Sequence, residues 1–348
     1  MRKKRLLSVL VALMLVLPVS LVLTSTALAM EQWVMASSGE GTFGYATATG
    51  MARMVDKYAK GVKLTVLPGY STTATHTVYD KGEANCAYIN LLSMKDAWKG
   101  MGAFAKNPLK TRVYHSLYFL SSAHTVVTTK KRTDINKLHD LIGKKFYPFY
   151  TGSGSHLLAR LVFGKEGLNI WDKITERQMG PKEITDAVRT GVVDAVWLYI
   201  ISGTRLTSTW QDLELRTDLR VVDPSEEEKA VISKIPGIVA PFKVDAKVFS
   251  KPIGVDPIWC MALLFGNNFG PREKAEEVYQ IIKAWDEHRA ELLAMNKGFA
   301  EFAERGVELT AAAIDALPQV PVHPGAARYL KEKGLWKETW KVGAVLAR

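Results

Sequence analysis

Apolar residues after residue 30 are concentrated in short segments, separated by longer segments with helical spacing. The short segments at 33–37, 62–67 and 85–89 predict strands. Between them, small and apolar residues recur every three or four positions over 45–59 and again over 72–80, which predicts two helices. This alternation of strand and helix predicts a parallel sheet with right-handed crossovers, the core of an α/β fold.

A second unit of the same kind follows in the middle of the chain. Mainly apolar segments over 117–128, 145–149 and, with the exception of Asp194, 192–199 predict further strands. The spacing over 156–164 and 182–189 predicts helices between them. Two successive α/β units predict a molecule of two lobes.

The pattern becomes helical toward the C-terminus. One more apolar run, 258–265, predicts a strand. Residues 271–298 and 299–305 then have strong helical spacing, and a short helix is expected over 326–333 after a proline-rich stretch.

The first 29 residues have a different pattern, which is typical of a secretory signal. A basic segment over 2–5 precedes an almost wholly apolar stretch over 6–23, and Ala27-Leu28-Ala29 has the small residues of a cleavage site. An uncleaved membrane anchor is the alternative, although Pro18 interrupts the apolar stretch. We expect cleavage near Ala29 and a mature protein in the periplasm, or otherwise outside the cytoplasm. No other apolar run approaches the roughly 20 residues that span a bilayer.

The charge of the chain is moderately basic. It carries 46 Lys and Arg against 35 Asp and Glu, and removal of the four basic residues of the leader leaves a formal charge of +7 on about 319 residues. The basic residues are scattered, and 130–132 is their longest run after the leader. Scattered charge is typical of a solvated surface, so we expect no nucleic-acid partner.

Cys86 and Cys260 are the only cysteines. In an oxidising compartment two cysteines can form a disulfide. Two separate buried thiols are the alternative, and the residues alone leave both open.

Gly39 to Gly44 matches G-x-G-x-x-G between a predicted strand and a predicted helix, a context that normally favours dinucleotide binding. That function also requires an acidic residue at the end of the second strand, to hold the ribose. The second strand ends at 65–69 without one, and the nearest acid, Asp56, lies in the preceding helix. We therefore expect no nucleotide and no other cofactor. What remains is a helix N-terminus whose free N–H groups suit an anion.

Residues 151–155, Thr-Gly-Ser-Gly-Ser, form a second polar loop between a strand and a helix. Its glycines let a ligand approach the backbone, and its hydroxyl groups add hydrogen-bond donors. Ligands of open parallel sheets lie beyond the carboxyl ends of the strands. Two such loops on facing lobes therefore predict one anion-binding cleft, although each loop alone is also compatible with an ordinary capped turn.

Patterns for catalysis and metal binding are weak. The seven histidines are dispersed, none belongs to H-E-x-x-H, and Thr151 stands where G-x-S-x-G requires glycine. We expect no catalytic residues and no metal site. An exported α/β enzyme is the alternative, and it requires Ser153 beside His124 or His156 with an orienting acid.

Aromatic residues lie in or beside the predicted ligand loops. Phe43 and Tyr70 belong to lobe I, and Trp197 and Tyr199 end a strand of the second unit. Small-molecule sites are mostly apolar with a few polar groups, so these rings are candidates for the cleft wall. A core position is the alternative for Trp197.

Several short motifs also follow one another in a distinctive order. They are Gly39-Glu40-Gly41-Thr42-Phe43, Pro68-Gly69-Tyr70-Ser71, Lys81-Gly82-Glu83-Ala84, the 151–155 loop before Ala159-Arg160, Gly191-Val192-Val193-Asp194-Ala195, and Pro321-Val322-His323-Pro324-Gly325-Ala326 with Tyr329. Together they resemble the TAXI class of TRAP transporter solute-binding proteins. The resemblance covers nearly the whole mature chain, and the order of the motifs is its most specific feature.

The resemblance implies a type II periplasmic-binding fold, in which two Rossmann-like lobes enclose a central cleft with a hinge. Lobe I would begin at 30–120, lobe II would be 121–250, and 251–348 would return to lobe I. Such a receptor captures a small organic anion, such as glutamate or 2-oxoglutarate, and delivers it to the small and large TRAP permease subunits, which are sometimes fused. An ABC importer or a sensor kinase is the alternative partner.

The resemblance and the loop analysis together predict the ligand-binding residues. They are Ser38, Gly41, Thr42, Phe43, Tyr70, Ser71, Thr72, Asn90, Thr151, Gly152, Ser153, Gly154, Ser155, Trp197 and Tyr199. The chain departs from the family where Tyr70 replaces a common glycine, and where Ala74 or Thr75 stands in place of a usual asparagine. The identity of the ligand is therefore not transferred.

The type II fold also implies a position for the two cysteines. In that fold, the strand returning from the second lobe pairs beside the third strand of the first. Cys86 lies in that third strand and Cys260 in the candidate return strand, so we expect them near each other. A Cα separation beyond about 7 Å would exclude a disulfide.

Overall fold

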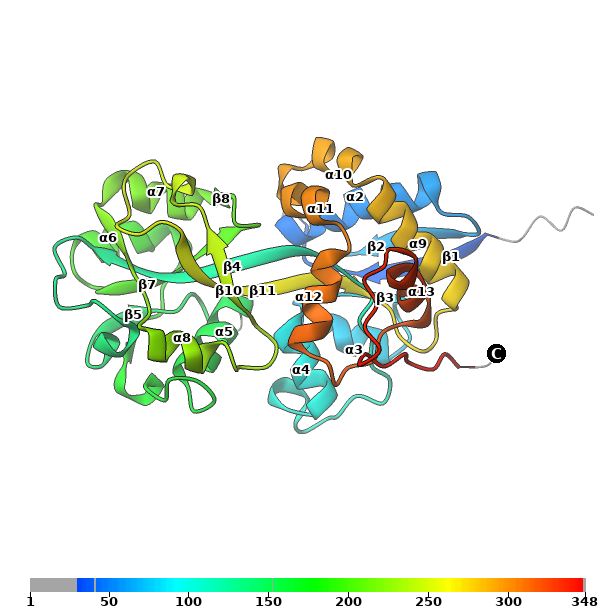
Figure 1. Ribbon diagram of the computed structural model, residues 1–348, viewed down its shortest axis with the longest axis horizontal. Helices are drawn as coiled ribbons and strands as arrows, with labels where there is room; N and C mark the ends of the chain where they lie inside the picture. Colours follow the sequence, from blue (N-terminus) through cyan, green and yellow to red (C-terminus); the bar gives the residue numbers. More distant parts are fainter. Residues whose placement is uncertain (1–29, 41, 152, 347–348) are drawn as a thin grey trace, which may run out of the picture.

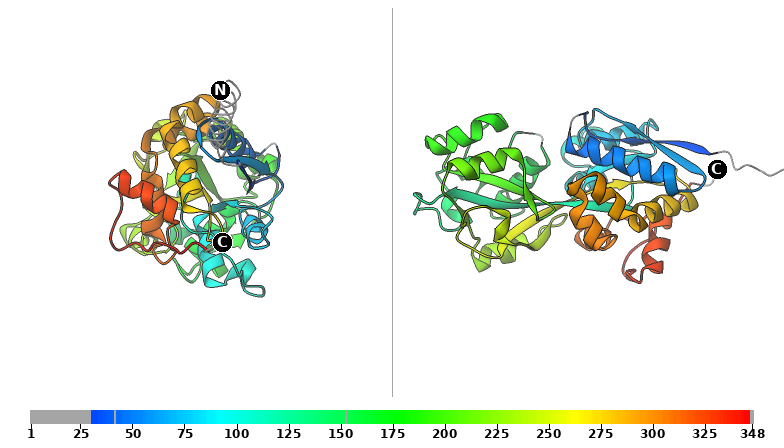
Figure 2. Two further views of the ribbon diagram at one scale, coloured as in Figure 1. Left: turned by 90° about the vertical axis from the view of Figure 1, so that its right-hand side faces the viewer. Right: turned by 90° about the horizontal axis from the view of Figure 1, so that it is seen from above.

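The computed structural model describes residues 30–40, 42–151 and 153–346, so the expected leader lies outside the described residues. Two lobes lie side by side along the longest axis of the molecule (Figure 1). Two long strands, β4 (Leu117–Thr129) and β11 (Ile258–Asn268), run through the middle and join the lobes, as the view from above also shows (Figure 2).

Lobe I begins with the strand–helix alternation that the sequence predicts. Its elements are β1 (Glu31–Ala36), α2 (Phe43–Tyr58), β2 (Val62–Leu67), α3 (Ala74–Asp80), β3 (Cys86–Asn90) and α4 (Leu91–Lys99). Helix α2 buries one face of small and apolar residues against the sheet, which explains its spacing. Helix α4, which the sequence analysis did not predict, begins directly at the end of β3, where Asn90 forms a capping box with Ser93.

Lobe II contains the second α/β unit and several short elements around it. They are β5 (Lys145–Tyr147), α5 (Gly154–Phe163), β6 (Thr175–Glu176), α6 (Ile184–Arg189), β7 (Ala195–Ile201), β8 (Arg205–Leu206), α7 (Ser208–Arg216), β9 (Leu219–Val222), α8 (Glu226–Ile232) and β10 (Val239–Val244).

The chain then returns to lobe I through β11 and ends in helices packed on the first unit. These are α9 (Ala275–Glu287), α10 (Arg289–Met295), α11 (Ala300–Arg305), α12 (Glu308–Ala316) and α13 (Pro324–Glu332). The predicted helix over 271–298 is divided, because the backbone leaves helical geometry at His288 and again at Asn296.

One sheet runs through both lobes, in the strand order β2-β1-β3-β11-β4-β7-β5-β6. Strands β1, β2 and β3 are parallel, whereas β11 is antiparallel to both β3 and β4. The return strand thus lies beside the third strand of lobe I, as expected for the type II periplasmic-binding fold, and the predicted fold class is confirmed.

The buried apolar residues form two main cores. The larger extends from Trp33 to Trp340: it joins the first unit to the C-terminal helices and also includes lobe II residues such as Phe146, Phe163 and Trp197. The second contains residues from Ala123 to Cys260 and belongs to lobe II. Lobe I therefore depends on segments from both ends of the chain.

The expected proximity of the two cysteines is wrong. Strand β11 does pair with β3, but Asn268 is the partner of Ala87, so Cys86 lies one position beyond the C-terminal end of β11. Cys260 lies near the other end of β11, where it pairs with Phe242 of β10. The roughly 3.3 Å rise per residue over these eight or nine positions separates the thiols by more than about 25 Å. Both cysteines are free and buried.

The described residues show neither a membrane-spanning helix nor a metal-binding cluster. No helix in the described ranges has the length and apolar character to cross a membrane. Likewise, no cluster of three or more His, Cys, Asp or Glu in that part of the chain has the arrangement of a metal site.

Candidate functional site

A cleft of about 470 Å³ opens between the two lobes at the crossing strands. Its lining residues come from both lobes and are Ser38, Gly39, Thr42, Phe43, Gly44, Tyr70, Ser71, Tyr88, Leu120, Ser122, Phe149, Tyr150, Ser153, Gly154, Ser155, Tyr199, Ile201 and Phe265. A volume of this size suits a small molecule.

Lobe I contributes the N-terminus of α2 to the cleft. Thr42 is the N-cap: its Oγ1 accepts a hydrogen bond from the Tyr45 N–H at 3.2 Å and donates one to the Gly39 carbonyl at 2.6 Å. The next two N–H groups, of Phe43 and Gly44, form no hydrogen bond with the described residues. They are therefore free to bind a ligand oxygen.

Lobe II contributes the N-terminus of α5 in the same way. Ser153 Oγ accepts from the His156 N–H at 3.1 Å and donates to the Tyr150 carbonyl at 2.8 Å. The N–H groups of Gly154 and Ser155 have no partner in the described part of the chain. Two helix N-termini, one from each lobe, thus supply backbone donors to one cleft.

Aromatic rings form the wall of lobe II. Phe149 and Tyr199 pack edge to face, with ring centres 5.4 Å apart. Phe149 is 8 % exposed and has a φ of 74°, in the left-handed region that a bulky residue rarely adopts. Such a conformation costs on the order of 1–3 kcal/mol and occurs preferentially at functional sites.

The cleft is polar but carries no charged side chain among its described lining residues. Its positive potential comes from the two helix N-termini, each equivalent to roughly half an elementary charge. Ser122, in the crossing strand β4, is 5 % exposed, and its hydroxyl has no hydrogen bond with the described residues. A hydroxyl at the floor of a cleft that has no partner among the described residues is available to a ligand.

His124 lies behind this surface and contacts it through Ser155. Its Nδ1 is 2.8 Å from the Ser122 carbonyl, and its Nε2 is 3.0 Å from Ser155 Oγ. The ring is fully buried, and the loss of solvation lowers its pKa to about 3. His124 is therefore neutral near pH 7.

The structure brings most of the predicted ligand residues together. Nine of them line the cleft: Ser38, Thr42, Phe43, Tyr70, Ser71, Ser153, Gly154, Ser155 and Tyr199. Gly41 and Gly152 lie outside the described residues. The contribution of each residue to binding stays a prediction.

Four predicted residues do not line the cleft. Trp197 is fully buried and packs against Phe163, so it is a core residue, which was the alternative prediction for this position. Thr151 is exposed. Asn90 is fully buried, and its Nδ2 donates a hydrogen bond to Thr72 Oγ1 at 2.8 Å.

The sequence indicated Gly39 and Gly44 only as the ends of the first predicted loop, and it did not indicate Tyr88, Leu120, Ser122, Phe149, Tyr150, Ile201 and Phe265. One signal was available for Ser122, because it interrupts an apolar strand with a polar side chain. The aromatic pair 149–150 directly precedes the predicted loop and gave a second signal. Leu120 and Phe265 carry no such signal, since they look like ordinary core residues of two long strands.

The arrangement required for a hydrolase is only partly present. Ser153 contacts neither His124 nor the His156 ring; its hydroxyl binds the Tyr150 carbonyl. Ser155 does lie within hydrogen-bond distance of His124, but the group orienting that ring is a backbone carbonyl instead of an acid. A histidine with a pKa of about 3 is also a poor base near neutral pH.

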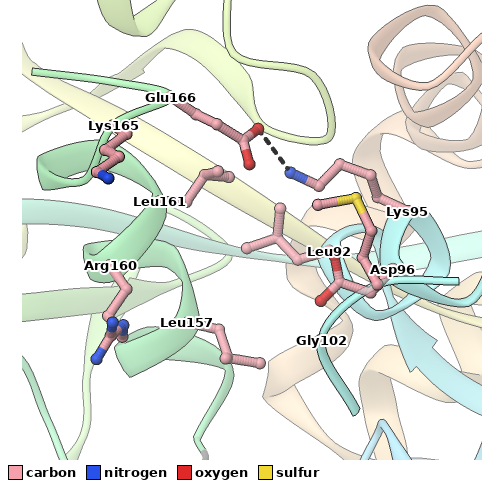
Figure 3. Close-up of a pocket in the computed structure, with 10 residues that line it drawn as sticks. Leu92, Lys95, Asp96, Gly102, Leu157, Arg160, Leu161, Lys165 and Glu166 are labelled. Atoms are coloured by element: carbon pink, nitrogen blue, oxygen red, sulfur yellow. Dashed lines mark hydrogen bonds and ion pairs between the residues drawn. The ribbon is translucent and has the colours of Figure 1, made fainter. Parts of the chain in front are cut away.

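A second groove, of about 270 Å³, lies between the lobes along α4 and α5 (Figure 3). Leu92 of α4 points toward Leu157 and Leu161 of α5 in this view. Lys95 Nζ reaches across to Glu166 Oε2 at 3.2 Å, with 4 % of the lysine side chain and 49 % of the glutamate side chain exposed. The lobes therefore already touch on one side of the cleft.

The chain has a general likeness to solved binding proteins. It is 14 % identical to the periplasmic aliphatic sulphonate binding protein SsuA from Escherichia coli, with a TM-score of 0.44 over 90 % of this chain and 96 % of that one. It is also 14 % identical to the periplasmic sulfonate-binding protein SsuA from Methylobacillus flagellatus, with a TM-score of 0.49 over 88 % of each chain.

A model of a protein family gives a more specific match. The model of the NMT1-like family matches residues 35–334, which include both lobes, the crossing strands and every described residue of the cleft. The match extends over 300 of the 348 residues. The chain therefore belongs to the NMT1-like family.

Proposed function

We propose that the protein is an extracytoplasmic solute-binding protein, which captures a small organic anion between its lobes and delivers it to a membrane permease. The observation that carries this proposal is the cleft, in which free N–H groups at the starts of α2 and α5 face the same space from opposite lobes. Backbone donors and helix dipoles favour an anion there without a charged side chain.

The fold supports capture and release. Strands β4 and β11 cross between the lobes, so bending of these strands would let the lobes move as units. A ligand that contacts both helix N-termini binds the closed form better than the open form. Its differential affinity therefore drives closure.

For the permease, we propose a TRAP transporter of the TAXI class, because the motifs quoted above follow the order of that class. An ABC importer remains the second candidate. Uptake by vesicles that contain the permease distinguishes them, since a TRAP system depends on an ion gradient and an ABC importer on ATP.

Ligand screening tests the proposal. The chain from Met30 is mixed with a panel of carboxylates, sulfonates, amino acids and sugar acids, and its melting temperature is measured. We expect at least one organic anion to raise the melting temperature by several degrees at 100 times its Kd, where linkage adds about 2.7 kcal/mol. If no member of the panel shifts it, the proposal is wrong.

A blocked cleft provides the specific control. A Cβ at Gly154 would lie 3.3 Å from Asn90 Nδ2 and 3.5 Å from the Phe265 ring, so Gly154→Leu would occupy the cleft. This variant should keep its circular dichroism spectrum and lose the ligand-induced shift. Ser233→Ala, at an exposed position after α8, should keep both.

The Ser155–His124 contact makes a hydrolase the second candidate from another class. The two functions differ in what happens to the bound molecule. We expect NMR of the released ligand to show an unchanged compound, and we expect no turnover of nitrophenyl esters above the rate of Ser155→Ala. Turnover that depends on Ser155 would support the hydrolase instead.

A further inference from the structure

His124 determines the direction in which the hydroxyl group of Ser155 donates its hydrogen. A backbone carbonyl has no hydrogen to donate, so the 2.8 Å contact with the Ser122 carbonyl requires a hydrogen on His124 Nδ1. In the neutral ring, Nε2 is then an acceptor. The 3.0 Å contact with Nε2 must therefore use the hydroxyl hydrogen of Ser155.

Ser155 consequently presents lone pairs to the cleft. Its hydroxyl hydrogen points back to His124, while the residue itself lines the cleft. The N-cap hydroxyls of Thr42 and Ser153 also direct their hydrogens to carbonyls, and each accepts an N–H bond. Ser155 is thus an acceptor set beside the free N–H donors at the start of the same helix.

The absence of acidic side chains restricts which donor can approach Ser155. No described lining residue is Asp or Glu, so an ammonium group would be desolvated without a counter-charge. A neutral hydroxyl needs only one acceptor. It would also avoid the cost of leaving the Ser155 lone pairs unpaired.

We propose that the ligand is a hydroxy acid: an anion whose charged oxygens bind the N–H groups of α2 and α5, and whose neutral hydroxyl donates to Ser155. His124 is a positioning residue, which acts on the ligand through Ser155. This inference rests on the proposed function and specifies its ligand class. It separates the expected ligand from amino acids and from 2-oxo acids, neither of which supplies a neutral donor at that point.

Matched acids test the inference. Calorimetry compares sets that differ at carbon 2 only, such as lactate, propionate, pyruvate and alanine, and 2-hydroxyglutarate, glutarate, 2-oxoglutarate and glutamate. Within any set that binds, we expect the hydroxy acid to bind about tenfold or more tightly than the others, as one lost hydrogen bond implies. Equal or tighter binding of the oxo, amino or unsubstituted acid would overturn the inference.

Variants separate positioning from a structural role. Ser155→Ala should remove most of the preference for the hydroxy acid. His124→Phe frees the Ser155 hydrogen, so the preference should shift toward the 2-oxo acid, whereas a structural role would weaken all acids equally. Ser233→Ala should retain the original preference.

A measurement on the unaltered protein covers the case in which His124→Phe does not fold. Nitrogen-15 NMR should show His124 as the neutral tautomer with hydrogen on Nδ1. Hydrogen on Nε2 would contradict the inference, whatever binds. If no anion binds at all, the proposed function fails, whereas binding without preference contradicts only the ligand class.

Discussion

Gly44 occupies a position in the cleft that a larger residue would disturb. A Cβ there would lie 2.4 Å from Ser38 Oγ and 2.9 Å from the Tyr88 ring. The serine can rotate, but the buried tyrosine cannot move freely. The glycine therefore keeps the backbone N–H groups of α2 open to the cleft.

We predict that Gly44→Ala weakens ligand binding by about tenfold or more and lowers the melting temperature by several degrees, since overpacking costs about 1–3 kcal/mol. Gly39→Ala is the matched control, because a Cβ at Gly39 meets nothing within 4 Å. Calorimetry and thermal unfolding of both variants check the prediction. Equal effects of the two substitutions would show that steric contact at Gly44 is unimportant.

Four buried histidines predict an acid-sensitive fold. Burial lowers the pKa to about 3 for His76 and His124, and to about 4 for His115 and His323. As the pH falls below 6.5, the unfolded chain takes up protons at these positions and the folded chain does not, so the free energy of unfolding decreases.

Two buried acids act in the opposite direction. Burial raises the pKa of Glu273 and of Glu301, so between pH 4.5 and their raised pKa the folded state holds more protons than the unfolded chain. Because these four histidines outnumber the two glutamates, we predict that the free energy of unfolding, measured with urea, decreases from pH 6.5 to 5. The slope should be shallower in His115→Gln and steeper in Glu301→Gln, and stability that rises on acidification would contradict the prediction.

At the scale of elements, α4 and α5 meet across the interlobe groove. Among the described residues, the Lys95–Glu166 ion pair joins the two lobes. Lys95 is nearly buried there and Glu166 is half-exposed. Solvent around the glutamate limits the pair to about 1 kcal/mol or less.

We predict that Glu166→Gln loosens this contact. Ligand affinity should fall by about two- to fivefold, through faster dissociation, because the closed form loses a contact that the open form lacks. Small-angle X-ray scattering should show a larger radius of gyration without ligand. Lys165 lines the same groove and forms no ion pair within the described part of the chain, so Lys165→Gln should change neither quantity.

Helices and strands whose apolar residues repeat at a clear spacing could be predicted from the sequence. Those whose position depends on contacts with distant parts of the chain could not. The strand over 62–67 has the predicted bounds, because its alternation of apolar and polar residues ends at a Pro-Gly turn. Helix α4 was missed, since its signal is the Asn90 cap inside an apolar run. Helix α7 was missed because it buries only a few residues against its neighbours, and β9 because it is four residues long.

The same difference between local patterns and distant contacts explains which parts of the candidate site could be predicted. The polar loops at 38–44 and 151–155 could be predicted, since glycine, serine and threonine before a helix indicate an N-cap from the local sequence alone. Ser122 and Phe265 enter the cleft only because β4 and β11 cross between the lobes. That crossing is a property of strand register, which local spacing does not contain.

At the scale of the whole molecule, each main core holds one free thiol. Cys86 belongs to the larger core and Cys260 to the core of lobe II. Burial raises the pKa of both thiols, so both are unreactive in the folded protein.

We predict that a thiol reagent modifies no cysteine of the folded protein within minutes and two cysteines after denaturation. The melting temperature should be the same with and without a reductant. A single free thiol, or none, after denaturation without reductant would contradict the separation of Cys86 and Cys260 along β11.

The sheet that runs through both lobes also governs when the chain can fold. The core of lobe I needs β11 and helices α9 and α13, so residues 31–129 lack their packing partners until the last quarter of the chain is present. Such distant pairing makes folding slow. For the exported protein proposed here, delay is useful: neither the emerging N-terminal strands nor the first lobe becomes a rigid body before synthesis is nearly complete. The chain then remains unfolded, so it can pass through a translocation channel and fold on the far side.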